Sequence, residues 1–259
     1  MDLNLKAKQL RKKMFETAVR AGRGHLGGAL SCMDILVSLY YGDIVTNDTK
    51  FILSKGHSGI ALYTVLAERN IISNTELHTF CKNGSLLSEH PNNHIPGIIT
   101  ITGSLGNGLG IGAGIAFAKK LNNTPDNVFV LMGDGECNEG SVWEAVRFAA
   151  VHALTNLRVI VDCNGFQSTD AVDKNTTYRQ LMKIWSAFGW MSYVVDGHNI
   201  LHLIEAYKNA SIVTPTVYIA RTVKGKGISF MENNVTSHHG LPNKGDTISA
   251  LEELSYGLA

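Results

Sequence analysis

The sequence predicts an α/β protein with an open parallel sheet flanked by helices on both faces. Short apolar runs, bounded by glycine or polar residues, alternate with segments of helix length. This alternation is typical of buried parallel strands joined by crossover helices. The candidate strands cover residues 51–54, 128–132, 158–162, 193–195 and 216–220. Ligands of such sheets bind at the carboxyl ends of the strands.

The segment before the first candidate strand is predicted to be helical. One helical face is indicated by apolar residues at helical spacing: Ala7, Leu10, Met14 and Ala18. A second helical pattern covers residues 33–41, beyond a glycine-rich break at residues 22–28. No repeat, low-complexity tract or proline-rich linker divides the chain, so we expect residues 1–259 to form a single domain.

The composition excludes several classes of protein. A chain of 259 residues with 44% hydrophobic and 17% charged residues can bury a sizeable core. A net charge of +1, with scattered Lys and Arg, indicates no nucleic-acid or membrane partner. No apolar run approaches the roughly 18 residues of a membrane span, and we expect a cytoplasmic protein. The cysteines lack CxxC spacing, so free thiols are expected rather than a zinc site or disulfides: Cys32, Cys81, Cys137 and Cys163.

Asp134 lies between two glycines directly after the second candidate strand. Glycine allows a sharp turn and close approach to a ligand, and the helix expected from about Asn138 offers free N–H groups for phosphate. An acid beside phosphate requires a divalent cation, and Mg²⁺ prefers oxygen ligands. Asn164 ends the next candidate strand, thirty residues later, and supplies a second oxygen. Two ordinary turns are the alternative, because Asp, Asn and Gly are common in turns.

The GDG motif followed by this asparagine resembles the thiamine diphosphate fingerprint. Other segments resemble transketolase in transketolase order: GRGHLGGALS with His25, LSKGHSGIALY with His57, EHPNNHIPGIITITGSLGNGLG with His90, and TSHHGLP with His239. The chain therefore resembles the N-terminal, diphosphate-binding half of a transketolase. Because the sequence ends at Ala259, where a full-length transketolase continues for two domains, we expect a separate subunit.

The resemblance implies a cofactor site. Thiamine diphosphate is the implied cofactor, with Mg²⁺ or another divalent cation such as Ca²⁺ or Mn²⁺ held by the side chains of Asp134 and Asn164 and the carbonyl of Phe166. The other implied cofactor-binding residues are His57, Ser104, Leu105, Gly106, Gly133, Gly135, Glu136 and His239. The sequence Asp162-Cys163-Asn164 departs from the two asparagines or Asp-Asn that family members often carry. A loose GxGxxA dinucleotide pattern at residues 108–113 is a rival interpretation of the glycine-rich stretch, without the flanking strand that such a motif needs.

The resemblance also implies a catalytic group of histidines that bind the ketose and move protons. These residues are His25, His57, His90 and His239, whereas His238 is taken as a neighbour of the matching histidine. For His78, His152, His198 and His202 we expect ordinary surface or core positions.

Further roles are implied for acids and lysines after the sheet residues. Glu139 and Glu144 match positions at a subunit interface, although acids also suit the start of any helix. Residues 221–234 resemble a loop that closes over the cofactor. Lys224 and Lys226 in this loop are either part of that lid or simply solvated.

The predicted function is transfer of a two-carbon ketol unit from a ketose, phosphorylated or otherwise anionic, to an aldose. The resemblance implies a C-terminal partner subunit that carries the pyrimidine-binding domain and an activating glutamate, in a two-plus-two heterotetramer. The chain alone is expected to be inactive. Two alternatives stay open: an enzyme like 1-deoxyxylulose-5-phosphate synthase, and a non-catalytic scaffold subunit of the same fold.

Overall fold

A computed structural model describes the whole chain except residues 125, 169, 173–176 and 259. Within the described residues, the strands form one parallel five-stranded sheet with the order β1-β2-β3-β5-β4. The strands are β1 (Lys50–Leu53), β2 (Val128–Gly133), β3 (Leu157–Cys163), β4 (Met191–Asp196) and β5 (Thr216–Arg221). Each predicted strand is confirmed, with boundaries that differ by at most two residues at either end.

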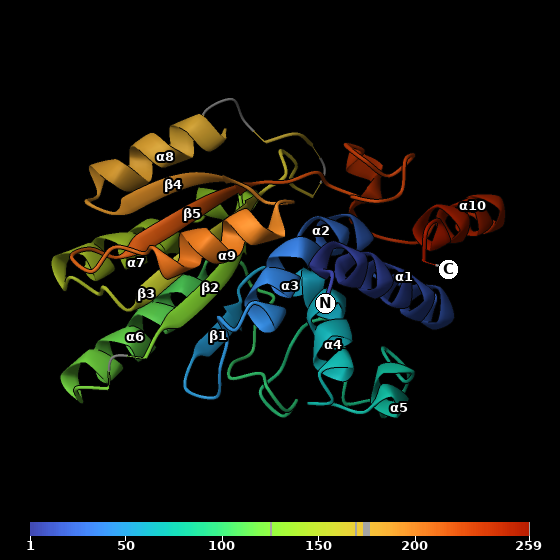
Figure 1. Cartoon of the computed structure of the whole chain (residues 1–259), viewed down its shortest axis with the longest axis horizontal. Coiled ribbons are helices and arrows are strands. Elements are labelled where there is room, and N and C mark those ends of the chain that lie inside the picture. The colour runs from blue at the N-terminus through green and yellow to red at the C-terminus, as the bar shows by residue number, and fades with distance from the viewer. Residues whose placement is uncertain (125, 169, 173–176, 259) are drawn as a thin grey trace.

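Helices cover both faces of this sheet. One face and its large core carry α1 (Leu3–Ala21), α2 (Leu26–Ser31), α3 (Met33–Tyr41), α4 (Gly59–Glu68) and α9 (Ile200–Lys208). The other face carries α6 (Asn107–Leu121), α7 (Gly140–Val151) and α8 (Tyr178–Ala187). The remaining helices are α5 (Asn74–Leu77), α10 (Lys244–Ser255) and the 3₁₀ turns Gly56–Ser58, Gly135–Asn138 and Val235–His238. Figure 1 shows α1 to α5 and α10 gathered at one end of the molecule, beside the sheet with α6 to α9.

The first helix begins and ends where the sequence provides capping groups. The Asp2 carboxylate accepts the N–H of Asn4 at 2.9 Å and so caps the first turn. Gly22 ends the helix in the left-handed conformation, with φ of 74°, which glycine adopts without strain. The four apolar residues predicted to share one face of this helix are all buried. The helix predicted for residues 33–41 is α3.

The helix expected from about Asn138 is interrupted. The structure has a 3₁₀ turn over Gly135–Asn138, and α7 starts at Gly140. Between them Glu139 is extended, with ψ of 129°. The sequence pattern did not distinguish this short turn from the first turn of the helix.

The glycines of α6 have two different roles. A Cβ on Gly108 would lie 2.3 Å from Ser54 Oγ, and one on Gly112 would lie 2.5 Å from Val130 Cγ2, so both permit close packing on the sheet. Gly110 and Gly114 have nothing within 4 Å of such a Cβ, and for them the expected close packing is wrong. All four lie inside the helix rather than in a strand-to-helix turn, which contradicts the dinucleotide interpretation.

The parallel register brings the predicted site residues to one edge of the sheet. Gly133 at the end of β2 is paired with Asp162 near the end of β3. Asp134 and Asn164 therefore follow neighbouring strands at the carboxyl edge. No helix in the described ranges is long and apolar enough to cross a membrane. The cysteines are free thiols, three of them buried and Cys81 partly so.

Candidate active site

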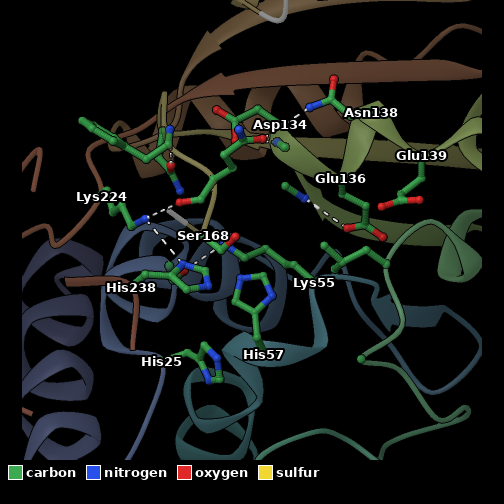
Figure 2. A pocket seen from close by; sticks show the side chains of 18 of the residues that line it. His25, Lys55, His57, Asp134, Glu136, Asn138, Glu139, Ser168, Lys224 and His238 are labelled. Atoms are coloured by element: carbon green, nitrogen blue, oxygen red, sulfur yellow. Dashed lines mark hydrogen bonds between the residues drawn. The ribbon is translucent and has the colours of Figure 1, made fainter. Parts of the chain in front are cut away.

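A cavity of about 400 Å³ lies at this carboxyl edge. Figure 2 shows its acids on the side of the strand ends and its histidines on the opposite side. Most of the predicted site residues line it: His25, His57, His90, Leu105, Gly133, Asp134, Gly135, Glu136, Asn164 and Phe166. Ser104, Gly106 and His239 are predicted site residues that do not line this cavity.

Asp134 is a buried acid without a basic partner in ion-pair contact among the described residues. Its Oδ1 accepts the N–H of Gly135 at 2.8 Å, and its Oδ2 accepts the N–H of Gly165 at 2.7 Å. Burial raises the pKa of this carboxyl group to about 6, although both hydrogen bonds oppose the rise. A buried carboxylate of this kind is suited to a bound cation.

Asn164 places a second oxygen at the same edge. Its Oδ1 accepts the N–H of Phe166 at 3.1 Å, while its Nδ2 donates to Ser31 Oγ at 3.3 Å, so the amide orientation is fixed. Carboxylate, amide and main-chain carbonyl oxygens form the hard donor set that Mg²⁺ prefers. A Cβ on Gly133 would meet nothing within 4 Å, which leaves the backbone open to close approach by a phosphate group. The residues present therefore fit a divalent cation beside a diphosphate.

Lys55 and Asp162 form a buried ion pair next to the cavity. Lys55 Nζ also donates to the carbonyl of Gly28 at 2.9 Å. The Asp162 carboxylate accepts Ser31 Oγ at 2.6 Å and the hydroxyl of Thr222. Although burial lowers the pKa of Lys55, the charge of Asp162 more than offsets this effect and raises it. No role for Lys55 was predicted from the sequence, where its position between an apolar strand and His57 was the available signal.

Lys224 is buried, so the solvated interpretation is wrong for this residue. Its Nζ donates to the carbonyl of Gln167 at 2.9 Å and lies 5.5 Å from the centre of the Phe166 ring. Burial lowers the pKa of Lys224 to about 8. Lys226 is more exposed, and its Nζ lies 3.4 Å from Glu232 Oε1. Closure of this loop over a ligand stays a prediction.

The histidines converge on His25. The centre of its ring lies 5.6 Å from that of His57, 6.0 Å from that of His90 and 4.5 Å from that of His239. His238 also belongs to the group, with its ring centre 5.3 Å from that of His25. His238 lines the cavity, whereas the side chain of His239 is 54% exposed and borders a neighbouring cavity. A site role for His238 was not predicted, because the resemblance favoured the next residue.

Basic neighbours keep two of these rings neutral. Burial, reinforced by Lys55, lowers the pKa of His57 well below its usual value. Burial, reinforced by Lys224, lowers the pKa of His238 to about 4. Figure 2 shows His238 next to Lys224 and on the same side of the cavity as His57 and His25. These rings can therefore act as neutral donors or acceptors at physiological pH.

Glu136 has a structural position beside the cavity. Its carboxylate accepts Ser54 Oγ at 2.5 Å and the N–H groups of Gly106 at 2.9 Å and Gly133 at 3.3 Å. It thereby joins the end of β1, the start of α6 and the end of β2. Glu139 lines the cavity and, like Glu144 on α7, is exposed, and their interface role stays a prediction.

Oxygen donors beside basic side chains at the carboxyl edge of a parallel sheet define an α/β domain suited to a phosphate-bearing ligand. The family described as the transketolase thiamine diphosphate binding domain matches residues 4–259, and the chain belongs to this family. The resemblance inferred from the motifs is thus confirmed, and the family is one of domains that bind thiamine diphosphate.

The similar proteins fall into two groups by length. The first of two apulose-4-phosphate transketolase chains, from Phocaeicola vulgatus and named as a subunit, is 36% identical over 98% of this chain and 94% of its own length. A 6-deoxy-6-sulfo-D-fructose transketolase subunit of Clostridium sp. is 33% identical over 92% of this chain and 91% of its own length. Human transketolase is 36% identical over 91% of this chain but only 39% of its own length. The crystal structure of Campylobacter jejuni transketolase superimposes with a TM-score of 0.88 at 26% identity, over 99% of this chain and 43% of that one.

Proposed function

We propose that this chain is the diphosphate-binding subunit of a two-subunit transketolase, which transfers a two-carbon ketol unit from a ketose to an aldose. The observation that carries the proposal is the cavity itself, in which Asp134 and Asn164 face a group of histidines. The coverage of the relatives supports it, because those matched over nearly their full length are named as subunits.

In this proposal the strand ends hold the cofactor's charged group. Asp134, Asn164 and the carbonyl of Phe166 bind a divalent cation, with Mg²⁺ preferred over Ca²⁺ or Mn²⁺. Lys55 and Lys224 lie beside the cavity and offset the negative charge of a diphosphate. Thiamine diphosphate, when bound, supplies the nucleophilic carbon that the twenty side-chain types do not provide.

The histidines carry out the proton movements. His25, His57 and His90 line the same cavity and can orient the hydroxyl groups of a ketose through neutral imidazole nitrogens. His239 borders the exposed side of the group and is proposed to contact substrate or cofactor at the mouth. The substrates are proposed to be anionic sugars, since the two subunit relatives are named for a sugar phosphate and a sulfosugar.

The proposed partner is a C-terminal subunit with the pyrimidine-binding domain and the activating glutamate, in a two-plus-two heterotetramer. The test is co-purification of this chain with candidate partner subunits, followed by a ketol-transfer assay with several ketose donors and thiamine diphosphate. We expect activity only from the complex, and Asp134→Asn is the matched inactive control. Transfer from pyruvate instead of a ketose would favour the synthase alternative, and a complex that binds no thiamine diphosphate would favour the scaffold.

A further inference from the structure

Glu89 is an acidic side chain in contact with the histidine cluster, defined as His25, His57, His90, His238 and His239. Its Oε1 lies 3.0 Å from His25 Nδ1 and 3.5 Å from His239 Nε2. The side chain is 18% exposed, and Oε1 itself is buried. Neither Oε1 nor His25 Nδ1 has an aligned hydrogen bond within the part of the chain that the structure describes. The contact is thus an ionic one, available for a proton that the cluster takes up.

Backbone packing fixes the segments that carry these groups. The N–H of Gly240 donates to the carbonyl of Gly24 at 3.1 Å, so the residues next to His25 and His239 are joined. A Cβ on Gly27 would lie 2.7 Å from the carbonyl oxygen of Ser237, and one on Gly59 would lie 2.8 Å from that of Glu89. The acid and both rings therefore meet in an arrangement set by the main chain, and not by the side chains alone.

The charges around the cluster differ from one ring to another. The positive charges of Lys55 and Lys224 act on His57 and His238, and Lys224 Nζ lies 3.4 Å from His238 Nδ1. His25 instead contacts the negative charge of Glu89. Burial lowers the pKa of His25, and Glu89 opposes that effect, while His239 and His90 reinforce it.

The groups facing Glu89 from other segments do not cancel its charge. Cys81 lies close enough to respond to it, since burial and then Glu89 raise the pKa of this thiol. Arg23 acts on Cys81 in the opposite direction. In the described residues, the ion pairs of Glu89 are with His25 and His239 alone. The carboxylate therefore directs its effect at these two rings.

We propose that Glu89 is a positioning residue that makes His25 the imidazole of the cluster which takes up the transferred proton, while His57 and His238 act as neutral groups. An ionised carboxylate only accepts, so His25 Nδ1 carries the hydrogen and Nε2 is the free acceptor. The inference rests on the proposed function for the reaction that uses this proton. The preference for His25 is a property of the chain alone.

The test is a pH titration of the histidines by ¹⁵N and ¹³C NMR on the purified chain, with wild type, Glu89→Gln and Glu89→Asp. We expect Glu89→Gln to lower the pKa of His25 by about one unit or more, because an opposite charge within ~4–6 Å has an effect of this size. Glu89→Asp should restore most of the shift, and the ¹⁵N shifts should report loss of the Nδ1–H tautomer only in Glu89→Gln. The control Glu252→Gln removes the charge of an exposed acid on α10 and should change nothing.

An unchanged His25 pKa and tautomer in a folded Glu89→Gln protein would overturn the inference. Circular dichroism establishes folding, and Glu89→Asp decides the question if the glutamine variant does not fold. In the complex with its partner, the pH-rate profile of ketol transfer should move to lower pH by the same amount, with unchanged cofactor affinity. A complex that transfers no ketol unit would contradict the proposed function, whereas the titration still decides the role of Glu89.

Discussion

The carboxylate of Asp134 accepts the N–H of Gly165 at 2.7 Å and so joins the loops that follow β2 and β3. The same carboxylate is the proposed metal ligand, and its second oxygen accepts the N–H of Gly135. The donor atoms are therefore positioned before any cation binds. The cost of this arrangement is a buried negative charge, which has a measurable consequence for stability.

Asp134→Asn should stabilise the metal-free chain above pH 6. The folded-state pKa of about 6 exceeds the unfolded value of 3.8, so folding favours the protonated form and wild-type stability falls as pH rises between these values. The difference amounts to at most about 3 kcal/mol. Thermal unfolding at pH 5 and pH 8 measures it, with the exposed Asp48→Asn as control. Mg²⁺ with thiamine diphosphate should stabilise wild type more than the variant, and an equal pH dependence of both proteins would contradict the prediction.

Lys55→Met should be strongly destabilising because it leaves Asp162 buried without its ionic partner. We expect a loss of about 3 kcal/mol or more, and a fall of roughly 10 °C in the unfolding midpoint. The matched control is Lys6→Met, since the Lys6–Glu68 pair at 3.0 Å is partly exposed and should contribute about 1 kcal/mol or less. Similar midpoints for the two variants would show that the buried pair has no special weight.

Lys224→Met should weaken the binding of thiamine diphosphate by the complex about tenfold at pH 7, the effect of losing one charged hydrogen-bond donor. Because its pKa is about 8, Lys224 is charged below that pH and loses its charge above it. Wild-type affinity should therefore decline from pH 7 to pH 9, and the variant should show a flatter profile. Calorimetric titration measures both. Lys226→Met, on the same loop but more exposed, should retain wild-type behaviour.

Two glycines of α6 offer a matched pair of substitutions. Gly112→Ala should destabilise the chain by about 1–3 kcal/mol, because its Cβ would lie 2.5 Å from Val130 Cγ2. Gly110→Ala, with nothing within 4 Å, should instead stabilise it by roughly 0.5–1 kcal/mol through helix propensity. Thermal unfolding of the isolated chain compares them, and a shift of the same sign in both would refute the packing argument.

The sequence was most informative where a local pattern determines the structure. Apolar runs located the five strands, and parallel topology then required Asp134 and Asn164 to lie at one edge. The extended residue Glu139 could not be foreseen, because the residues around it are compatible with both a 3₁₀ turn and the first turn of a helix. Local periodicity does not separate these two short conformations.

The rest of the site depends on contacts between distant segments. Lys55 is buried because Asp162, 107 residues further along, supplies the opposite charge. Lys224 looked like a solvated lysine between glycines, and only the packing of its loop on residues 27 and 237 encloses it. Glu89 lies beside a transketolase-like motif but had no predicted role, since its contact with His25 joins two separate loops. No single-sequence pattern records such pairings.

Glu136 accepts hydrogen bonds from Ser54, Gly106 and Gly133, which belong to three separate stretches of chain. These stretches cannot rearrange independently without breaking bonds to one carboxylate. Evolution of a different specificity in this cavity is therefore expected to proceed through the histidine side, where residues contact one another by side chains, while the opposite wall is inherited as a unit.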